Sequence, residues 1–87
     1  MANTDVKTAV FNALKTGRFS DDSDFVDVSD GSDGTLHVVV VSRKFDRQHG
    51  EDRNDLIWKD LFAKLPKDVW GQITLTVGVT PEDIKAA

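Results

Sequence analysis

Two histidines are the only imidazole groups in the sequence, and an imidazole can hold a metal ion or transfer a proton near neutral pH. His37 lies in a valine-rich segment, and His49 precedes a helical pattern that begins near residue 52. A metal site that uses His37 and His49 is therefore one candidate. The alternative is that His37 is a strand residue with its ring at the sheet surface and that His49 is an exposed loop residue.

An acid-rich segment lies between residues 21 and 33, where six aspartates are mixed with serine and glycine. Carboxylates bind calcium, but a calcium-binding loop needs a glycine at its sixth position and a glutamate at its twelfth. The segment does not meet this spacing, so it is interpreted as a solvated loop and turn. The six residues are Asp21, Asp22, Asp24, Asp27, Asp30 and Asp33.

The sequence contains no arrangement that is typical of an active site. No Ser, His and Asp stand at a recognisable triad spacing, and no glycine-rich phosphate loop follows a strand pattern. Because the chain has no cysteine, it cannot by itself form a disulfide, hold an iron–sulfur cluster through thiolates or use a cysteine nucleophile. Asp52 and Asp55 are interpreted as first-turn charges that favour a helix N-terminus. We therefore predict that the protein is not an enzyme.

Length and charge limit the organisation of the chain. With 87 residues there is no room for a second core, so we predict one domain over residues 1–87. Residues 1–33 contain seven acidic and three basic side chains, whereas residues 34–87 contain eight of each, so the net charge of −4 belongs to the first third. The longest apolar run, Val38–Val41, is far too short to span a membrane, and no signal-peptide pattern is present. We expect a cytoplasmic protein without a membrane partner.

Hydrophobic periodicity predicts two long helices and three strands. The first helix begins at Thr4 and can end at Gly17, and the second follows Asp52 and stops at Pro66. Strands are predicted over residues 25–29, 36–42 and 72–79, with a turn at 29–34 between the first two. Between the second strand and the second helix lies a loop with room for a short helical turn. Pro81 can begin a last short helix, with Thr80 as its cap.

The strand patterns also predict which side chains are buried. Residues 36–42 are apolar on both faces, which indicates a central strand. In the last strand, apolar residues alternate with Thr74, Thr76 and Gly78, so the apolar set is predicted to be buried and the threonines exposed. The apolar set consists of Ile73, Leu75, Val77 and Val79.

The aromatic side chains of the second helix are predicted to belong to the core. Trp58 and Phe62 stand four residues apart in an apolar stripe that also contains Ile57, Leu61 and Leu65. Trp70 lies in a connecting turn, and an exposed tryptophan at that place would mark a contact surface.

The order of the elements predicts the architecture. It is helix, strand, strand, loop with a short helical turn, helix, strand, or αββ(α)αβ. A helical crossover usually places the strand that follows it parallel to its neighbour, which gives a three-stranded mixed sheet. A small sheet offers one good apolar face, so both helices should cover the same face. We predict an α+β fold, a two-layer α/β sandwich with the element order of KH-like domains of the second topology.

A run of residues from Val38 to Glu82 resembles the BolA family. The family carries a valine-rich strand that ends in Val-Ser, a following Phe, the helix start Arg-His-x-x-Val-Tyr-x-x-Leu, and Thr-Pro-Glu after the last strand. In this chain Thr80-Pro81-Glu82 follows the last strand pattern. The other matching positions are Val41, Ser42, Phe45, Arg53, Ile57, Trp58 and Leu61.

The resemblance implies a KH-like fold and a non-catalytic adaptor or regulatory protein in stress response or iron–sulfur metabolism. It implies a monothiol glutaredoxin as partner, no cofactor on the chain alone, and an iron–sulfur cluster shared with that partner. The implied contact region is the loop at 43–53 and the start of the second helix. The candidate partner-binding residues are Phe45, Arg47, Arg53 and Asn54.

The sequence departs from the family at two places. Asn54 stands where the family has its signature His, and Trp70-Gly71-Gln72 stands where the family often has His-Ala-Leu. Asparagine is a poor substitute for an imidazole ligand. A shared cluster would therefore need another ligand, for which His37 and His49 are the candidates in this chain, or the binding is independent of a cluster.

Two other functions are open at this point. A KH-like nucleic-acid-binding domain is one, since residues 43–67 carry a small excess of basic charge. However, Gly50 has no partner glycine for a Gly-x-x-Gly turn, and an isoelectric point near 4.9 weakens binding to phosphates. The other is a small regulatory domain with no ligand of its own. We expect a monomer or a weak dimer in every case.

Overall fold

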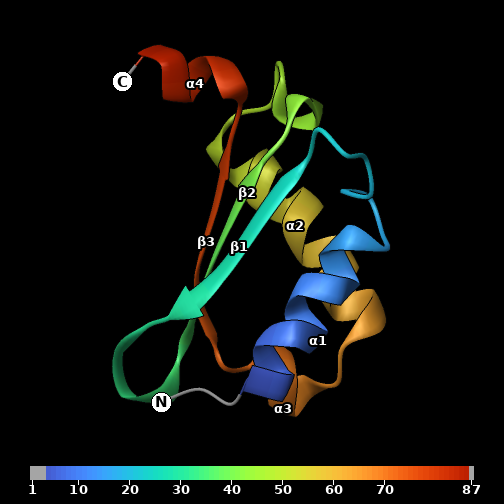
Figure 1. Cartoon of the computed structure of the whole chain (residues 1–87), viewed down its shortest axis with the longest axis vertical. Coiled ribbons are helices and arrows are strands. Elements are labelled where there is room, and N and C mark those ends of the chain that lie inside the picture. Colours follow the sequence, from blue (N-terminus) through green and yellow to red (C-terminus); the bar gives the residue numbers. More distant parts are fainter. Residues whose placement is uncertain (1–3, 87) are drawn as a thin grey trace.

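The computed structural model describes residues 4–86, whose helices and strands are labelled in Figure 1. Helix α1 (Thr4–Lys15) precedes a hairpin of strands β1 (Phe25–Asp30) and β2 (Leu36–Val41). The long helix α2 (Gly50–Lys64) and the short helix α3 (Lys67–Trp70) lead to strand β3 (Ile73–Val79), and helix α4 (Pro81–Ala86) follows. Short 3₁₀ turns lie at Ser32–Gly34 and Arg43–Phe45, and the second of these is the helical turn predicted in the loop.

The sheet has the predicted mixed topology. Its strand order is β1-β2-β3, with β1 antiparallel and β3 parallel to the central strand β2. The hairpin turn places Asp33 (φ 56°) and Gly34 (φ 79°) in the left-handed region, which Asp-Gly pairs tolerate well. The crossover through α2 makes β3 parallel because the chain returns to the starting end of β2 before β3 begins.

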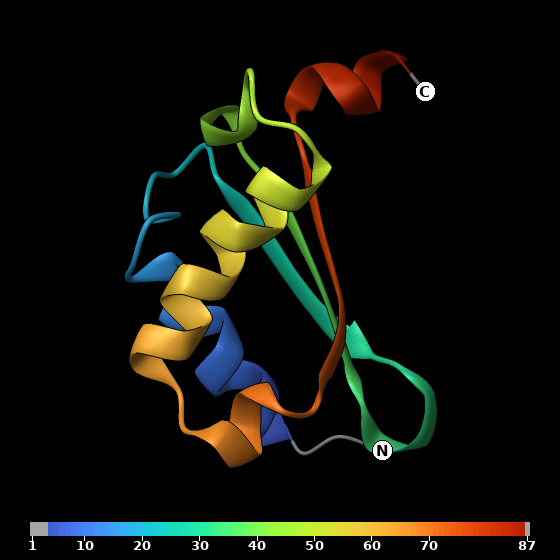
Figure 2. The same ribbon diagram turned by 180° about the vertical axis from the view of Figure 1, so that it is seen from behind.

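The helices α1, α2 and α3 cover one face of the sheet, and its other face is open (Figures 1 and 2). The core lies between these two layers, so the predicted two-layer α+β sandwich is confirmed. None of the helices formed by residues 4–86 combines the length and the hydropathy needed to cross a membrane. The core residues are Val10, Leu14, Phe19, Val26, Leu36, Val38, Val40, Phe45, Ile57, Leu61 and Ile73.

The last helix begins with the predicted cap residue Thr80, which forms a reciprocal cap with Asp83. The backbone N–H of Asp83 donates to Thr80 Oγ1 at 3.1 Å, and the backbone N–H of Thr80 donates to Asp83 Oδ2 at 3.0 Å. Pro81 occupies the first helical position, where its missing N–H leaves no hydrogen bond unmade. This cap fixes the direction in which α4 leaves the end of β3.

The predicted burial pattern of β3 is wrong, because an irregularity at its start reverses its faces. Leu36 pairs with Ile73, but the next residue of β2, His37, pairs with Leu75, so one extra residue is inserted in β3. Ile73 is buried toward the helices, whereas Leu75 is 47% exposed. After the irregularity it is Thr76 and Gly78 that face the helices, since a single inserted residue flips every later side chain.

The open face of the sheet is consequently more apolar than the sequence predicts. Successive pairs across the sheet place three rows of side chains on it, and the two rows nearest the end of β2 are mostly apolar. Phe25, on the edge strand β1, is 57% exposed. The three rows are Phe25, Val41 and Val79; Asp27, Val39 and Val77; and Ser29, His37 and Leu75.

The reversed faces lead to a stability prediction that uses the same substitution at two leucines. Leu75→Ala should lower the free energy of unfolding by no more than about 1 kcal/mol, because the side chain is half in solvent. Leu36→Ala should cost about 2–4 kcal/mol, because Leu36 is fully buried. Urea denaturation followed by circular dichroism measures both values. Equal losses at the two sites would contradict the register of β3.

Candidate functional site

Three aromatic rings of α2 and α3 form a cluster in which Phe62 is exposed and the two tryptophans also pack against the core. Trp58 and Phe62 of α2 lie with ring centroids 5.0 Å apart, and Trp70 of α3 meets both rings edge-on, at 6.2 Å from Trp58 and 4.9 Å from Phe62. Such edge-to-face pairs hold aromatic rings in a defined arrangement. We call Trp58, Phe62 and Trp70 the aromatic surface.

The aromatic surface is open to solvent at its centre. Phe62 is 56% exposed, and the two tryptophans are partly buried. The prediction that Phe62 belongs to the core is therefore wrong. In the apolar stripe of α2, only Ile57 and Leu61 are fully buried, whereas Phe62 lies on the solvent side of the helix. Trp70 packs on the same surface through α3, a short helix where a connecting turn was predicted.

A chain of hydrogen bonds joins the aromatic surface to Asn54. Trp58 Nε1 donates to Thr76 Oγ1 at 3.2 Å, and Thr76 Oγ1 donates to Asn54 Oδ1 at 3.1 Å. Thr76 reaches this place because the irregularity in β3 turns it toward α2. Asn54, which the BolA resemblance aligns with the family's signature His, therefore lies at the border of the aromatic surface and presents an amide there.

Arg53, the neighbouring candidate residue, forms hydrogen bonds with three other segments of the chain. Its Nε donates to the carbonyl oxygen of Gln48 at 2.8 Å, and its Nη1 donates to the carbonyl oxygen of Gly78 at 3.1 Å and to Asp83 Oδ2 at 2.8 Å. The guanidinium thus ties the loop before α2 to the end of β3 and to α4. The backbone N–H of Thr80 and the Arg53 guanidinium together lower the pKa of Asp83 below its usual value.

Phe45 and Arg47 have different places in the loop before α2. Phe45 is fully buried, lies 5.4 Å from Phe19 between ring centroids, and anchors the 3₁₀ turn in the core. A side chain at Gly78 would meet both the Phe45 ring, at 2.9 Å, and Arg53 Cβ, at 3.2 Å. Phe45 and Arg53 therefore lie side by side over this glycine. Arg47 is exposed and has a left-handed backbone conformation (φ 67°).

The two histidines lie toward opposite ends of β2. His37 is the second residue of β2 and faces the open side of the sheet beside the hairpin turn. His49 precedes the first residue of α2, beyond the other end of β2, and is exposed. The four residue steps from His37 to Val41 alone span roughly 13 Å. The fold therefore does not bring His37 and His49 into one metal site, and no group of three or more potential ligands gathers within residues 4–86.

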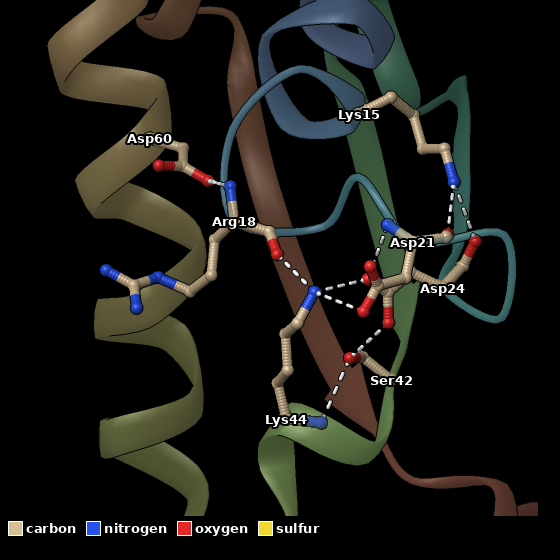
Figure 3. Close-up of polar contacts among 7 residues, drawn as sticks. All are labelled: Lys15, Arg18, Asp21, Asp24, Ser42, Lys44 and Asp60. Carbon is tan, nitrogen blue, oxygen red and sulfur yellow. Dashed lines mark hydrogen bonds and ion pairs between the residues drawn. The ribbon is translucent and has the colours of Figure 1, made fainter.

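A buried polar network that was not predicted from the sequence lies at the end of β2 (Figure 3). The Ser42 hydroxyl donates to Asp24 Oδ1 at 2.6 Å, and Lys44 Nζ donates to Asp24 Oδ2 at 2.6 Å. Lys44 Nζ also contacts Asp21 Oδ2 at 3.3 Å and the carbonyl oxygen of Arg18. The network fastens the acidic loop between α1 and β1 to the start of the 43–45 turn.

The network sets the charges of its members. Burial by itself would raise the pKa of Asp24, but hydrogen bonds from Lys44 and Ser42 and the positive charge of Lys44 outweigh it and lower that pKa. Burial would likewise lower the pKa of Lys44, and its hydrogen bonds and ion pairs with Asp24 and Asp21 raise it. The pair is therefore charged at neutral pH. Ser42 is fully buried and its hydroxyl is already bonded, so the geometry indicates a role in structure.

One sequence signal could have identified this network. Asp24 is the last residue before β1, and Ser42 follows β2 directly. Neighbouring antiparallel strands bring these two positions to the same end of the hairpin.

Comparisons with protein-family models, with curated proteins and with solved structures found no match.

Proposed function

We propose that the protein is a non-catalytic adaptor that binds a protein partner through the aromatic surface. The observation that carries this proposal is Phe62, a large apolar ring that is 56% exposed and is held between two tryptophans. Aromatic residues dominate the binding energy of many protein interfaces, because they bury a large area and lose little conformational freedom. Asn54 and Thr76 add polar groups at the border, where they can fix the orientation of a partner.

The BolA resemblance suggests the class of partner. It points to a monothiol glutaredoxin in the cytoplasm and to a role in stress response or iron–sulfur metabolism. Because Asn54 replaces the family's His and the two histidines lie apart, we propose that binding does not require an iron–sulfur ligand from this chain. A cluster, where one is present, would then be held by the partner.

The two tryptophans make the proposal directly measurable. Trp58 and Trp70 are the only tryptophans, the sequence has no tyrosine, and both rings belong to the aromatic surface. Titration with an apo and with a cluster-loaded monothiol glutaredoxin should change the tryptophan emission, after subtraction of the partner's own signal, and give a complex that co-elutes in gel filtration. Phe62→Ala should weaken binding by about thirtyfold, which corresponds to the loss of a central aromatic contact.

Phe25→Ala provides the matched control for this prediction. Phe25 is 57% exposed, nearly the same as Phe62, but lies on the open face of the sheet, so its replacement should leave the affinity unchanged. Equal weakening by both substitutions would contradict the aromatic surface as the contact. An unchanged emission and no co-elution with either form of glutaredoxin would overturn the choice of partner. A salt-dependent shift with short DNA or RNA would favour the KH-like alternative instead.

A further inference from the structure

The outer edge of β1 presents backbone groups that no strand pairs. Among residues 4–86, β1 pairs only with β2. The backbone N–H of Gly31 donates to the carbonyl oxygen of Thr35 at 2.9 Å, and this pair continues the register of the hairpin. In an antiparallel pair, hydrogen-bonded and non-hydrogen-bonded positions alternate. Gly31 is a hydrogen-bonded position, so Val28 and Val26, which lie three and five residues before it, are non-hydrogen-bonded positions. Their N–H and C=O groups therefore point away from β2.

A shallow pocket of about 310 Å³ lies beside this edge and is lined by residues of β1 and α1. Phe11 of α1 contributes an exposed ring, and Val26 and Val28 contribute the apolar side of the strand. Lys7 lies at the rim, where its charge is balanced by Asp30 at 2.8 Å. An open strand edge beside a helix can bind an added strand. Hydrogen bonds to the strand backbone then provide affinity, and the pocket provides specificity by accepting a side chain.

Two exposed carboxylates without an ion-pair partner among residues 4–86 lie on β1 and on the loop that leads into it. Other acidic side chains of residues 1–33 are neutralised by lysines, since Asp21 and Asp24 pair with Lys44, and Asp30 pairs with Lys7. Asp22 and Asp27 are exposed, and neither forms an ion pair with the described residues. If a second copy of the chain paired along this edge, the acidic side chains of the two β1 strands would lie close together. Repulsion between these like charges disfavours such a dimer. The edge therefore favours a partner segment of opposite sign.

We propose that β1 binds an extended, basic segment of a partner protein, which adds as a fourth strand and places an apolar side chain in the pocket beside Phe11. This site lies at the opposite edge of the sheet from β3 and the aromatic surface, and it does not rest on the function proposed above. With both surfaces occupied, the domain would hold two partner segments at once.

A synthetic peptide in which lysine alternates with valine and leucine is the probe for this site. Titration into the full ¹⁵N-labelled chain in about 50 mM salt should shift the amide signals of Phe11, Val26 and Val28, and it should slow hydrogen exchange at Val26 and Val28. The same peptide with glutamate in place of lysine should not bind. Shifts that lie elsewhere, equal binding of the glutamate peptide, or no saturable binding of the lysine peptide would overturn the proposal.

Two substitutions test the geometry. Val28→Pro removes an outward N–H and no bond of the β1–β2 ladder, and proline is tolerated at such edge positions, so peptide binding should weaken about tenfold. Thr8→Trp fills the pocket from the surface of α1 and should weaken binding at least as much, which keeps the test decisive should Val28→Pro fail to fold. Phe62→Ala should leave peptide binding unchanged. Wild-type affinity in folded Val28→Pro and Thr8→Trp would contradict strand addition.

Discussion

Replacing Phe45 with alanine is expected to lower the free energy of unfolding by about 3–5 kcal/mol. Phe45 is fully buried, packs against Phe19, and covers the backbone of Gly78. The substitution removes most of an aromatic side chain, and the surrounding helix and strand can close the resulting cavity only in part. For a domain of 87 residues, whose total stability is about 5–10 kcal/mol, this loss is a large fraction of the whole.

Phe62→Ala makes the same chemical change on a side chain that is 56% exposed, and it should cost about 1 kcal/mol or less. Urea denaturation of both variants, followed by circular dichroism, gives the two values. The sequence predicts that Phe45 contacts a partner and that Phe62 belongs to the core, whereas in the structure Phe45 is buried and Phe62 is exposed. The two variants test this assignment directly. A Phe45→Ala variant with nearly wild-type stability would mean that Phe45 does not anchor the loop.

Asp24→Ala is expected to lower the free energy of unfolding by about 2–3 kcal/mol. The substitution leaves the buried Ser42 hydroxyl without its acceptor and Lys44 without its main counter-ion. Removing one partner of a fully buried ion pair costs more, but the Lys44 side chain is 34% exposed and can be hydrated again. Asp22→Ala is the matched control. Asp22 is an exposed member of the same acidic loop, and its replacement should change stability by less than about 0.5 kcal/mol.

The same network predicts a dependence on pH. An aspartate in an unfolded chain titrates near about pH 4, and the pKa of Asp24 is lowered in the folded protein. The stabilisation that its charge provides is therefore complete above about pH 4 and is lost as the pH falls through the lower folded value. The stability difference between the wild type and Asp24→Asn should shrink over this acidic range. Because Asp83 is present in both proteins, its own lowered pKa cancels from the difference. A constant difference down to about pH 2 would contradict the charged network.

The sequence by itself determined the order of the strands and of every helix except the short α3, which was predicted as a connecting turn. Hydrophobic periodicity located α1, α2 and all three strands, the Thr-Pro start located α4, and the apolar faces of residues 36–42 identified β2 as the central strand. The length of the crossover predicted the parallel pairing of β2 with β3. These features follow from local rules, because the spacing of apolar residues, prolines and turn residues acts within a few residues of the chain.

Tertiary structure alone decided which side chains of those elements face solvent. One inserted residue at the start of β3 turned Leu75 outward and brought Thr76 to Trp58 and Asn54. The periodicity of β3 is the same with or without this insertion, so no local pattern reveals it. Phe62 likewise has helical spacing with the core residues of α2, but it packs against Trp58 and Trp70 and is 56% exposed. The candidate surfaces depend on such long-range packing, since the register between strands and the extent of a neighbouring layer are set by residues far apart in the chain.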